Sequence, residues 1–373
     1  MMIHTVSHKQ KETSFFSIRN KMITSFAVFA VSILTIVYIV AIYFASVSLL
    51  NNTEYFLKEL VKSSSKVLDE RSQALFGKLE AFSNLPFIQD DTVSYQEKIE
   101  LFKNEIQMQK QRGWLSFGIS GLDGMLYRTD NTVEKVASAD WFQSARKGKY
   151  IITEPSQSAT DRRYIFIVAI PMRDLQGKIT GVINATILGD ALSNLISDII
   201  VGETGTAYLV SSSGTVLGNR RPEILYKSIY NEIIGSDTSA FAKFLKQALA
   251  SHKSSVNVSE IKGVEYISAV ASMRYADWTL LLTAPISEFM AENVTNLIKT
   301  FVIIALCQLI IAIALGVLIA RNITRPINHV IAALKNIAQG EGDLTIELPA
   351  SGKDETSVLS SYFNQTILKL KNS

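Results

Sequence analysis

The sequence predicts an α+β membrane protein with two transmembrane helices, a mixed helix-and-strand domain between them, and a helical hairpin after the second. Three observations predict this class. Two long runs, residues 26–50 and 301–320, contain no charged residue. The segment between them changes from a helical period to short strand-like runs separated by turns, and the segment after them returns to a helical period.

Composition narrows the possible classes further. The 373 residues are 47% hydrophobic, which is high for a wholly soluble chain. The net charge of +3 comes from scattered Lys and Arg residues, so no basic face predicts nucleic-acid binding. The sole cysteine, Cys307, lies in an apolar run, and the four histidines are dispersed. We therefore expect no disulfide framework, no metal site and no cofactor.

Residues 23–50 and 297–320 are predicted to be the transmembrane helices. A run of about 20 residues, rising about 1.5 Å each, reaches the thickness of the hydrocarbon core of a bilayer. Buried helices of soluble proteins rarely remain apolar on all sides over such a length. The first run is also longer than the apolar part of a cleaved signal peptide, so we interpret it as an uncleaved anchor.

The charges beside the two spans predict their orientation. Basic residues precede the first span and follow the second, whereas uncharged and acidic residues follow the first. The positive-inside rule therefore places residues 1–22 and both termini in the cytoplasm and residues 51–293 outside. The basic residues are Lys9, Lys11, Arg19, Lys21, Arg321 and Arg325, and the others are Asn51, Asn52 and Glu54.

A long amphipathic helix is predicted after the first span. Apolar residues recur there at intervals of three, four or seven, and the helix should end near Asn84 and Pro86. Such a helix must pack on the domain behind it, on a partner copy, or on both. The predicted stripe consists of Phe56, Leu60, Val67, Leu75, Leu79 and Phe82.

Two stretches of the outer segment resemble each other and predict tandem modules. In the first, a hairpin over residues 117–130 turns at Leu122 to Gly124, and two strands within residues 162–187 are joined through Asp174 to Gly177. In the second, a hairpin turns at Gly214, and another strand pair lies within residues 265–285. We expect a distal module at about residues 84–190 and a proximal module at about 200–288, each with an antiparallel sheet.

This order of elements resembles a double Cache domain, the extracytoplasmic sensor of many bacterial chemoreceptors and sensor kinases. The resemblance covers residues 51–293 and is most specific over residues 141–149 and 202–217. It implies two PAS-like modules on the long helix, with a small ligand usually held in the distal one.

Amino-acid-binding members of that family grip the ligand with an Arg in an R-x-W-Y motif and with an Asp near the end of the last distal strand. In this sequence Trp141 is kept, Phe142 replaces the Tyr, and Ala139 and Thr186 replace the two charged anchors. Neither replacement provides a charge partner. The resemblance therefore implies a small polar or aromatic metabolite rather than a zwitterionic amino acid.

Aromatic and polar residues of the distal module are the candidate ligand-binding residues, because small-ligand pockets combine an apolar lining with a few placed polar groups. Two interpretations stay open at this point. The aromatic residues either line the pocket or are core residues, and the charges either bind the ligand or are solvated turn residues. The candidates are Trp141, Phe142, Asp140, Arg128, Tyr127, Tyr164 and Thr186.

Residues 321–373 contain two helical stripes around a Gly- and Pro-containing loop and resemble a HAMP linker. Narrow heptad stripes require a coiled-coil partner, so two chains would form a parallel four-helix bundle in a homodimer. The first stripe is Ile327, Val330, Leu334 and Ile337, and the second is Leu359, Phe363, Thr366 and Leu370. The resemblance implies signal-relay roles for Pro326, which would open the first helix, and for Gly342, Leu344, Leu348 and Glu355.

Together these features predict a chemoreceptor in the bacterial inner membrane that binds a small ligand outside and relays the signal inward. No motif of a hydrolase, kinase, metalloprotease or nucleotide-binding enzyme occurs, so we expect no catalytic activity. The alternatives are the sensor portion of a histidine kinase or diguanylate cyclase, and a stand-alone sensor. The chain ends at Ser373, so any module that contacts chemotaxis signalling proteins is expected beyond it.

Overall fold

The computed structural model describes residues 18–159, 161–231, 239–339, 345–350, 352 and 354–371. It divides into two compact units, which we describe separately. The sheet unit is Val47–Glu292, and the helical unit combines Met1–Ser46 with Asn293–Ser373. Two long helices, α1 (Ile18–Ser83) and α8 (Ile286–Ala338), contribute residues to both units.

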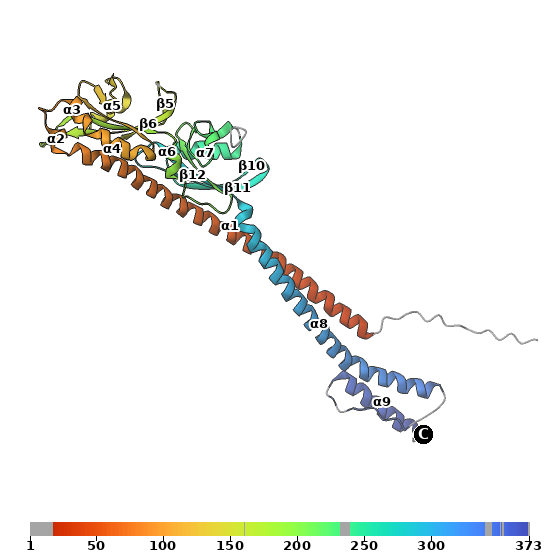
Figure 1. Ribbon diagram of the computed structural model, residues 1–373. Coiled ribbons are helices and arrows are strands. Elements are labelled where there is room, and N and C mark those ends of the chain that lie inside the picture. Colours follow the sequence, from red (N-terminus) through yellow and green to blue (C-terminus); the bar gives the residue numbers. More distant parts are fainter. Residues whose placement is uncertain are drawn as a thin grey trace, which may run out of the picture. The chain divides into compact units, whose positions relative to one another are not determined.

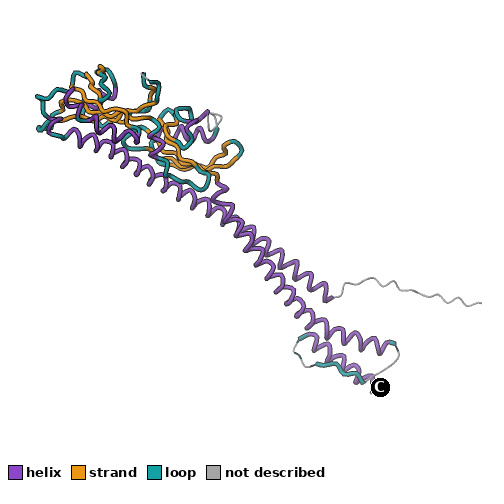
Figure 2. The backbone as a smooth tube through the Cα atoms, in the orientation of Figure 1, coloured by secondary structure: helices purple, strands orange, loops and turns teal. Residues whose placement is uncertain are grey.

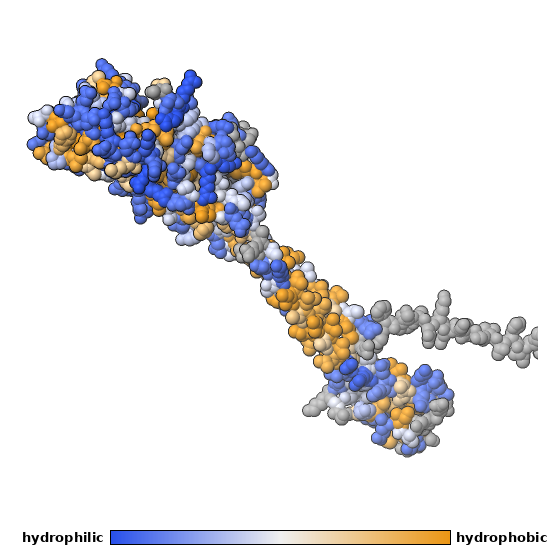
Figure 3. All heavy atoms as spheres, viewed as in Figure 1, coloured by the Kyte–Doolittle hydropathy of each residue, from blue (hydrophilic) through white to orange (hydrophobic). Residues whose placement is uncertain are grey.

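Within the helical unit, α1 and α8 contain the two predicted apolar runs. Both helices are long and apolar enough to cross a membrane, and only 0% and 6% of their most apolar windows are buried inside the chain. Apolar side chains therefore cover the surface of this helix pair (Figure 3). The two helices are in contact, because the Tyr38 hydroxyl donates to the Phe301 carbonyl at 2.9 Å and Ile23 lies beside Gly316.

The first sheet of the sheet unit, sheet A, is antiparallel with strand order β3-β2-β1-β7-β6-β4, and β5 also pairs with β6. Figure 1 labels β5 and β6 of this sheet. Its strands are β1 (Trp114–Gly121), β2 (Met125–Arg128), β3 (Val133–Lys135), β4 (Ile151–Ile152), β5 (Ser156–Gln157), β6 (Tyr164–Arg173) and β7 (Ile179–Leu188). Its helices are α2 (Pro86–Gln89), α3 (Tyr95–Glu100), α4 (Phe102–Gln109), the 3-10 turn η1 (Lys110–Arg112) and α5 (Asp140–Ala145).

The second sheet, sheet B, is antiparallel with strand order β10-β11-β12-β8-β9. Its strands are β8 (Thr206–Ser211), β9 (Val216–Gly218), β10 (Ser255–Ile261), β11 (Val264–Ser272) and β12 (Trp278–Pro285), with α6 (Ala191–Leu195), the 3-10 turn η2 (Pro222–Ile224) and α7 (Ala240–Ser251). The order β2-β1-β7-β6 in sheet A matches β9-β8-β12-β11 in sheet B. This match confirms the predicted repeat of hairpin and strand pair.

The predicted hairpin turns are confirmed by the strand boundaries. Sheet A turns between Gly121 and Met125, as expected from Leu122 to Gly124, and again between Arg173 and Ile179. In sheet B, Gly214 has a φ of +86°, a backbone conformation that glycine adopts without steric cost.

One face of each sheet packs against α1 and forms the main hydrophobic core (Figure 2). The helix ends at Ser83, as predicted, but its buried stripe differs from the predicted one. Phe56 and Val67 are exposed, because they lie beside the face that α1 presents to the sheets. The apolar side chains that α1 buries are Leu57, Val61, Leu68, Phe76 and Leu79. Each such residue contributes about 1.5–3 kcal/mol by leaving water.

The opposite faces of the two sheets are covered by shorter helices. On sheet A, Phe142 and Ala145 of α5 pack against Leu126, Ala169 and Val182. On sheet B, α7 buries its apolar side against a separate cluster that includes Tyr208, Val210, Val270 and Leu281. Each sheet therefore lies between two layers, with α1 on one side and a short helix on the other.

In the helical unit, the last part of α8 packs on α9 (Glu355–Lys371). Glu355 is the first residue of α9, and the Asp354 carboxylate accepts a hydrogen bond from the Ser357 amide at 2.9 Å, which caps the helix. Leu348 is buried in the hairpin, and Asn364 holds its backbone through two hydrogen bonds of 2.9 and 2.8 Å.

One prediction about this hairpin is wrong. Pro326 lies inside α8 and does not open a helix, because α8 continues through it from the apolar stretch. Within the single chain, the hairpin is closed by Val330, Ala333, Leu348, Phe363 and Ile367. Of the predicted stripes, Val330 and Phe363 belong to this cluster, whereas Leu334, Leu359, Thr366 and Leu370 are exposed in the single chain. Gly342 and Leu344 lie outside the described residues.

Candidate ligand-binding site

The face of sheet A beneath α5 collects polar side chains in the middle of the distal module. Side chains alternate between the two faces of a strand, so the partners in a cross-strand row share a face. One row runs Arg128–Gly118–Asn184–Ala169 across β2, β1, β7 and β6. The neighbouring rows bring Ser116 beside Thr186, and Ser120 beside Leu126 and Val182. We call Ser116, Ser120, Arg128, Asn184 and Thr186 the polar face.

Buried atoms without hydrogen-bond partners concentrate on the polar face. Of the eight such side-chain atoms in the described part of the chain, five belong to it: Ser120 Oγ, Arg128 Nε, Asn184 Nδ2, Asn184 Oδ1 and Thr186 Oγ1. Ser120, Asn184 and Thr186 are at most 3% exposed. Leaving a buried polar group unpaired costs about 1–3 kcal/mol, and proteins normally satisfy it with water or a ligand. These atoms are therefore available to a bound molecule.

Gly118 creates the space that Asn184 occupies. A Cβ atom at Gly118 would lie 2.4 Å from Asn184 Oδ1 and 2.7 Å from Leu126 Cδ1. The absence of a side chain lets the Asn184 amide lie against the β1 backbone at the centre of the face. Glycine at this position is explained by that close approach.

The charge on the polar face is already compensated. Arg128 Nη2 lies 2.8 Å from Glu134 Oε2 on the edge strand β3, while its Nε is buried and unpartnered. Among the described strands of sheet A, β3 places a carboxylate on this face, that of Glu134. The Glu134 side chain is 58% exposed. The buried interior of the face therefore offers neutral donors and acceptors and one N–H of a paired arginine.

Four of the seven predicted residues lie together at this site. Arg128 and Thr186 belong to the polar face, Phe142 is fully buried against it, and Trp141 packs at the edge of the same cluster. The rings of Trp141 and Phe142 meet edge to face, with centroids 6.0 Å apart. The site combines an aromatic wall with the polar row.

The other three predicted residues lie elsewhere. Tyr127 neighbours Arg128 in β2, so it faces the opposite side, where it stacks on Tyr95 at 5.9 Å. Tyr164 stacks on Tyr226 at 3.7 Å, between the two modules. Asp140 is exposed at the first position of α5.

Sequence reasoning missed Asn184, Ser120 and Gly118. Their signal is visible in the sequence, because polar or small residues occupy alternate positions of otherwise apolar strands at 116, 118 and 120 and at 184 and 186. In a strand, such alternation predicts one polar face.

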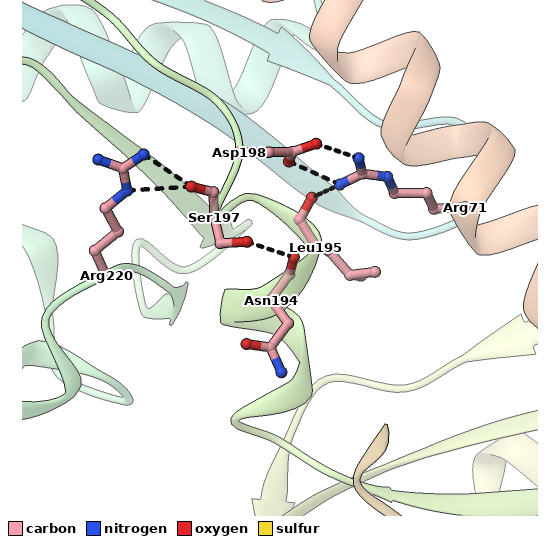
Figure 4. A network of polar contacts seen from close by, with 6 residues as sticks. All are labelled: Arg71, Asn194, Leu195, Ser197, Asp198 and Arg220. Carbon is pink, nitrogen blue, oxygen red and sulfur yellow. Dashed lines mark hydrogen bonds and ion pairs between the residues drawn. The ribbon is translucent and has the colours of Figure 1, made fainter. Parts of the chain in front are cut away.

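A concavity of about 570 Å³ lies between α1 and the other face of sheet A. Two of its cations are paired, since the Arg71 guanidinium binds the Asp198 carboxylate through two hydrogen bonds, and Lys78 lies 3.0 Å from Glu105 and over the Trp114 ring. Figure 4 shows Arg71 also reaching the Leu195 carbonyl, while Arg220 donates to the Ser197 carbonyl. The hydrogen bond and charge of Asp198 raise the pKa of Arg71. These contacts join α1 to the segment between the modules.

A metal centre has no support in the described residues, where no group of three or more His, Cys, Asp or Glu side chains is placed to hold an ion.

Comparison with known proteins identifies two domain families in this chain. A Cache domain model matches residues 41–292, and a HAMP domain model matches residues 318–372. The methyl-accepting chemotaxis protein TlpA of Bacillus subtilis is 26% identical over 95% of this chain and 51% of its own length. The methyl-accepting chemotaxis protein PscA of Pseudomonas syringae is 27% identical over 62% of this chain and 36% of its own length. The chain thus spans between about a third and a half of these relatives.

Among solved structures, the ligand-binding domain of the Campylobacter jejuni chemoreceptor Tlp3 in complex with L-valine is similar in fold. It covers 66% of this chain and 98% of its own, with a TM-score of 0.50 and 15% sequence identity. Because the Cache domain model matches more than half of the residues, the chain belongs to the Cache domain family, and its Cache and HAMP domains together resemble the sensory half of methyl-accepting chemotaxis proteins.

Proposed function

We propose that this chain is the sensing portion of a bacterial chemoreceptor whose distal module binds a small, polar, non-zwitterionic metabolite between α5 and the polar face. The observation that carries the proposal is the group of five buried, unpartnered atoms on Ser120, Arg128, Asn184 and Thr186. A ligand with both donors and acceptors would pair these atoms, and a flat apolar body would contact Trp141 and Phe142.

The charge pattern favours a ligand without an ammonium group. The Tlp3 domain was solved with the amino acids L-valine and isoleucine, whose ammonium groups require acceptors. The carboxylate that the described sheet brings to this face is Glu134, which is largely exposed and already paired with Arg128. Thr186 provides a hydroxyl at the position where amino-acid-binding members of the family have an Asp carboxylate. An uncharged polar metabolite is therefore the best match to the site.

We further propose that α1 and α8 cross the inner membrane, with the Cache domain outside and both termini in the cytoplasm. The support is the excess of Lys and Arg before the first apolar run and after the second. The corresponding boundaries are residues 23–50 and 297–320 for the spans, 51–293 for the sensor and 321–373 for the HAMP linker.

The proposed active form is a homodimer. On α1, Tyr55, Phe56 and Val67 are exposed on a helix whose other side is buried in the core. On the inner hairpin, Leu334, Leu359 and Leu370 are likewise exposed. A second copy that covers both stripes would remove this apolar area from water and would complete a four-helix bundle at the HAMP linker.

The relay proposed here is a population shift. Ligand binding in the distal module changes the preferred packing of α1 against α8, and the HAMP hairpin then repacks. The chemotaxis relatives favour a methyl-accepting output module and contacts with chemotaxis signalling proteins, while a histidine kinase or cyclase output remains the second candidate. With either output module, this chain binds the ligand and relays the signal, and neither task requires a catalytic residue in it.

Isothermal titration of the full chain in lipid nanodiscs tests the ligand site. A panel of uncharged polar metabolites and common amino acids is titrated against the wild type, Arg128→Gln and the control Arg146→Gln, which removes an exposed cation near α5. We expect binding of a panel metabolite, weakened by about tenfold or more in Arg128→Gln only. Binding of common amino acids that Arg128→Gln leaves unchanged would contradict the proposal.

A further inference from the structure

The proximal module contains a concavity of about 440 Å³ on the α7 side of sheet B. Its floor is formed by β8, β12 and β11, where Thr206 pairs with Thr283 and Thr283 pairs with Ser268. The turn between β10 and β11 and the segment around Arg221 form its sides. This polar band lies beyond the apolar cluster that α7 covers.

The concavity occupies the same place in sheet B as the polar face does in sheet A. Strands β8 and β12 correspond to β1 and β7 in the two matching strand orders. Thr283 is the third residue from the end of β12, as Thr186 is the third from the end of β7. The repeat therefore places polar side chains at corresponding positions of both sheets.

The lining is cationic. Arg221 and Lys262 both contribute to it, and neither has an acidic partner in the described residues. Strand alternation turns Glu260 and Glu265 toward the other face of the sheet. Glu288, which binds the lining residue Thr204, is already engaged by the amides of residues 203 and 204. The positive charge of the recess thus remains uncompensated.

Neutral hydrogen-bond donors stand beside these cations. Arg221 Nη2 lies 3.3 Å from the Tyr208 hydroxyl, which leaves other guanidinium N–H groups for a ligand. Tyr208 is only 3% exposed, and its burial raises the pKa of its phenol. Its hydroxyl accepts from Arg221 and has a proton of its own to offer a ligand. The Thr206 hydroxyl is on the same face.

We propose that this recess is a second ligand site, which binds a small oxyanion, either a carboxylate or a phosphate, through Arg221, Lys262 and the Tyr208 hydroxyl. An arginine fork, an ammonium and a phenol are donors that suit the oxygens of such an anion. The proposal is independent of the ligand proposed for the distal module, because the two faces belong to different sheets.

The test uses the full chain in nanodiscs at about 0.15 M salt, which screens weak surface binding. Inorganic phosphate, acetate and succinate are titrated separately, and their relative affinities distinguish a phosphate from a carboxylate site. We expect at least one to bind, and expect Arg221→Gln and Lys262→Gln each to weaken it by about tenfold. Tyr208→Phe, which keeps the ring in the core, should weaken it several-fold.

Two controls separate this site from others. Lys253→Gln removes an exposed cation of the same module, and Arg128→Gln alters the distal site; neither should change anion affinity. Thermal unfolding verifies that Arg221→Gln and Tyr208→Phe remain folded. The proposal is overturned if none of the three anions binds, or if Arg221→Gln weakens binding no more than Lys253→Gln does.

Discussion

Asn184 and Thr186 are two buried polar residues of β7 in the proposed ligand site. Both are almost fully buried, and neither amide nor hydroxyl has a partner within the described chain. Isolated buried groups of this kind reduce stability, so their presence at alternate positions of β7 is better explained by binding than by folding. At these two positions, the side chains that suit ligand binding are therefore not those that would best stabilise the fold.

Thr186→Val tests this separation, because valine has nearly the shape of threonine but no hydroxyl. Without ligand, we expect the variant to be as stable as the wild type or more stable by about 1 kcal/mol, since an unpaired buried hydroxyl is removed. Ligand binding should weaken. Chemical denaturation and titration of the same preparation measure both effects. A clear loss of stability would mean that the hydroxyl has a structural partner.

The strand alternation also explains which site residues could be predicted. Trp141, Phe142, Arg128 and Thr186 were selected for their chemistry and for a family motif, and they lie together. Tyr127 directly follows Leu126 and precedes Arg128, so the period of two already excluded it from their face. Asn184 and Ser120 carry no charge or aromatic ring, and only their alternation marks them.

At the scale of elements, the hairpins were predictable because Gly and Asp fix the turns, and α1 was predictable because its period is long. The buried face of α1 was not predictable, because apolar residues lie on two sides of the helix. Which side is buried depends on the sheets that pack against it. The apolar stripe of α7, which consists of Phe241, Leu245 and Leu249, is visible in the sequence. The six-residue helix α5 is too short for periodicity to indicate, and its position depends on tertiary packing.

Glu288 connects α8 to the proximal module. From the first turn of the helix, its carboxylate accepts hydrogen bonds from the amides of Glu203, at 2.8 Å, and Thr204, at 3.1 Å, and from the Thr204 hydroxyl. Gly202 permits the approach, because a Cβ there would lie 2.3 Å from the carboxylate. Burial alone would raise the pKa of Glu288, but the hydrogen bonds from residues 203 and 204 outweigh it and lower the pKa.

This contact predicts a pH dependence. Because the pKa of Glu288 is lower in the folded state, its contribution to stability is complete above the unfolded value of about 4.3 and is lost as the pH falls through the folded value. Glu288→Gln should lower the melting temperature at pH 7 and reduce its fall below about pH 4. The control Glu265→Gln should change neither. Equal acid sensitivity of Glu288→Gln and wild type in thermal scans would contradict the assignment.

At the scale of the whole molecule, α1 and α8 link the two-sheet Cache domain to the helical unit that contains the HAMP hairpin. Both helices contribute residues to the sheet unit and to the apolar pair. A ligand influences the inner hairpin only if it binds one packing of these helices more tightly than another. The central claim is therefore that occupancy of the polar face changes how α1 and α8 pack.

Disulfide formation between α1 and α8 tests that claim directly. A Cβ at Gly316 lies 3.6 Å from the Ile23 Cα, so cysteines at positions 23 and 316, in a chain with Cys307→Ser, are within reach of each other. We predict that the metabolite found by titration changes the rate of their disulfide formation in nanodiscs, and that Arg128→Gln abolishes the change. Identical rates with and without saturating ligand would contradict the account.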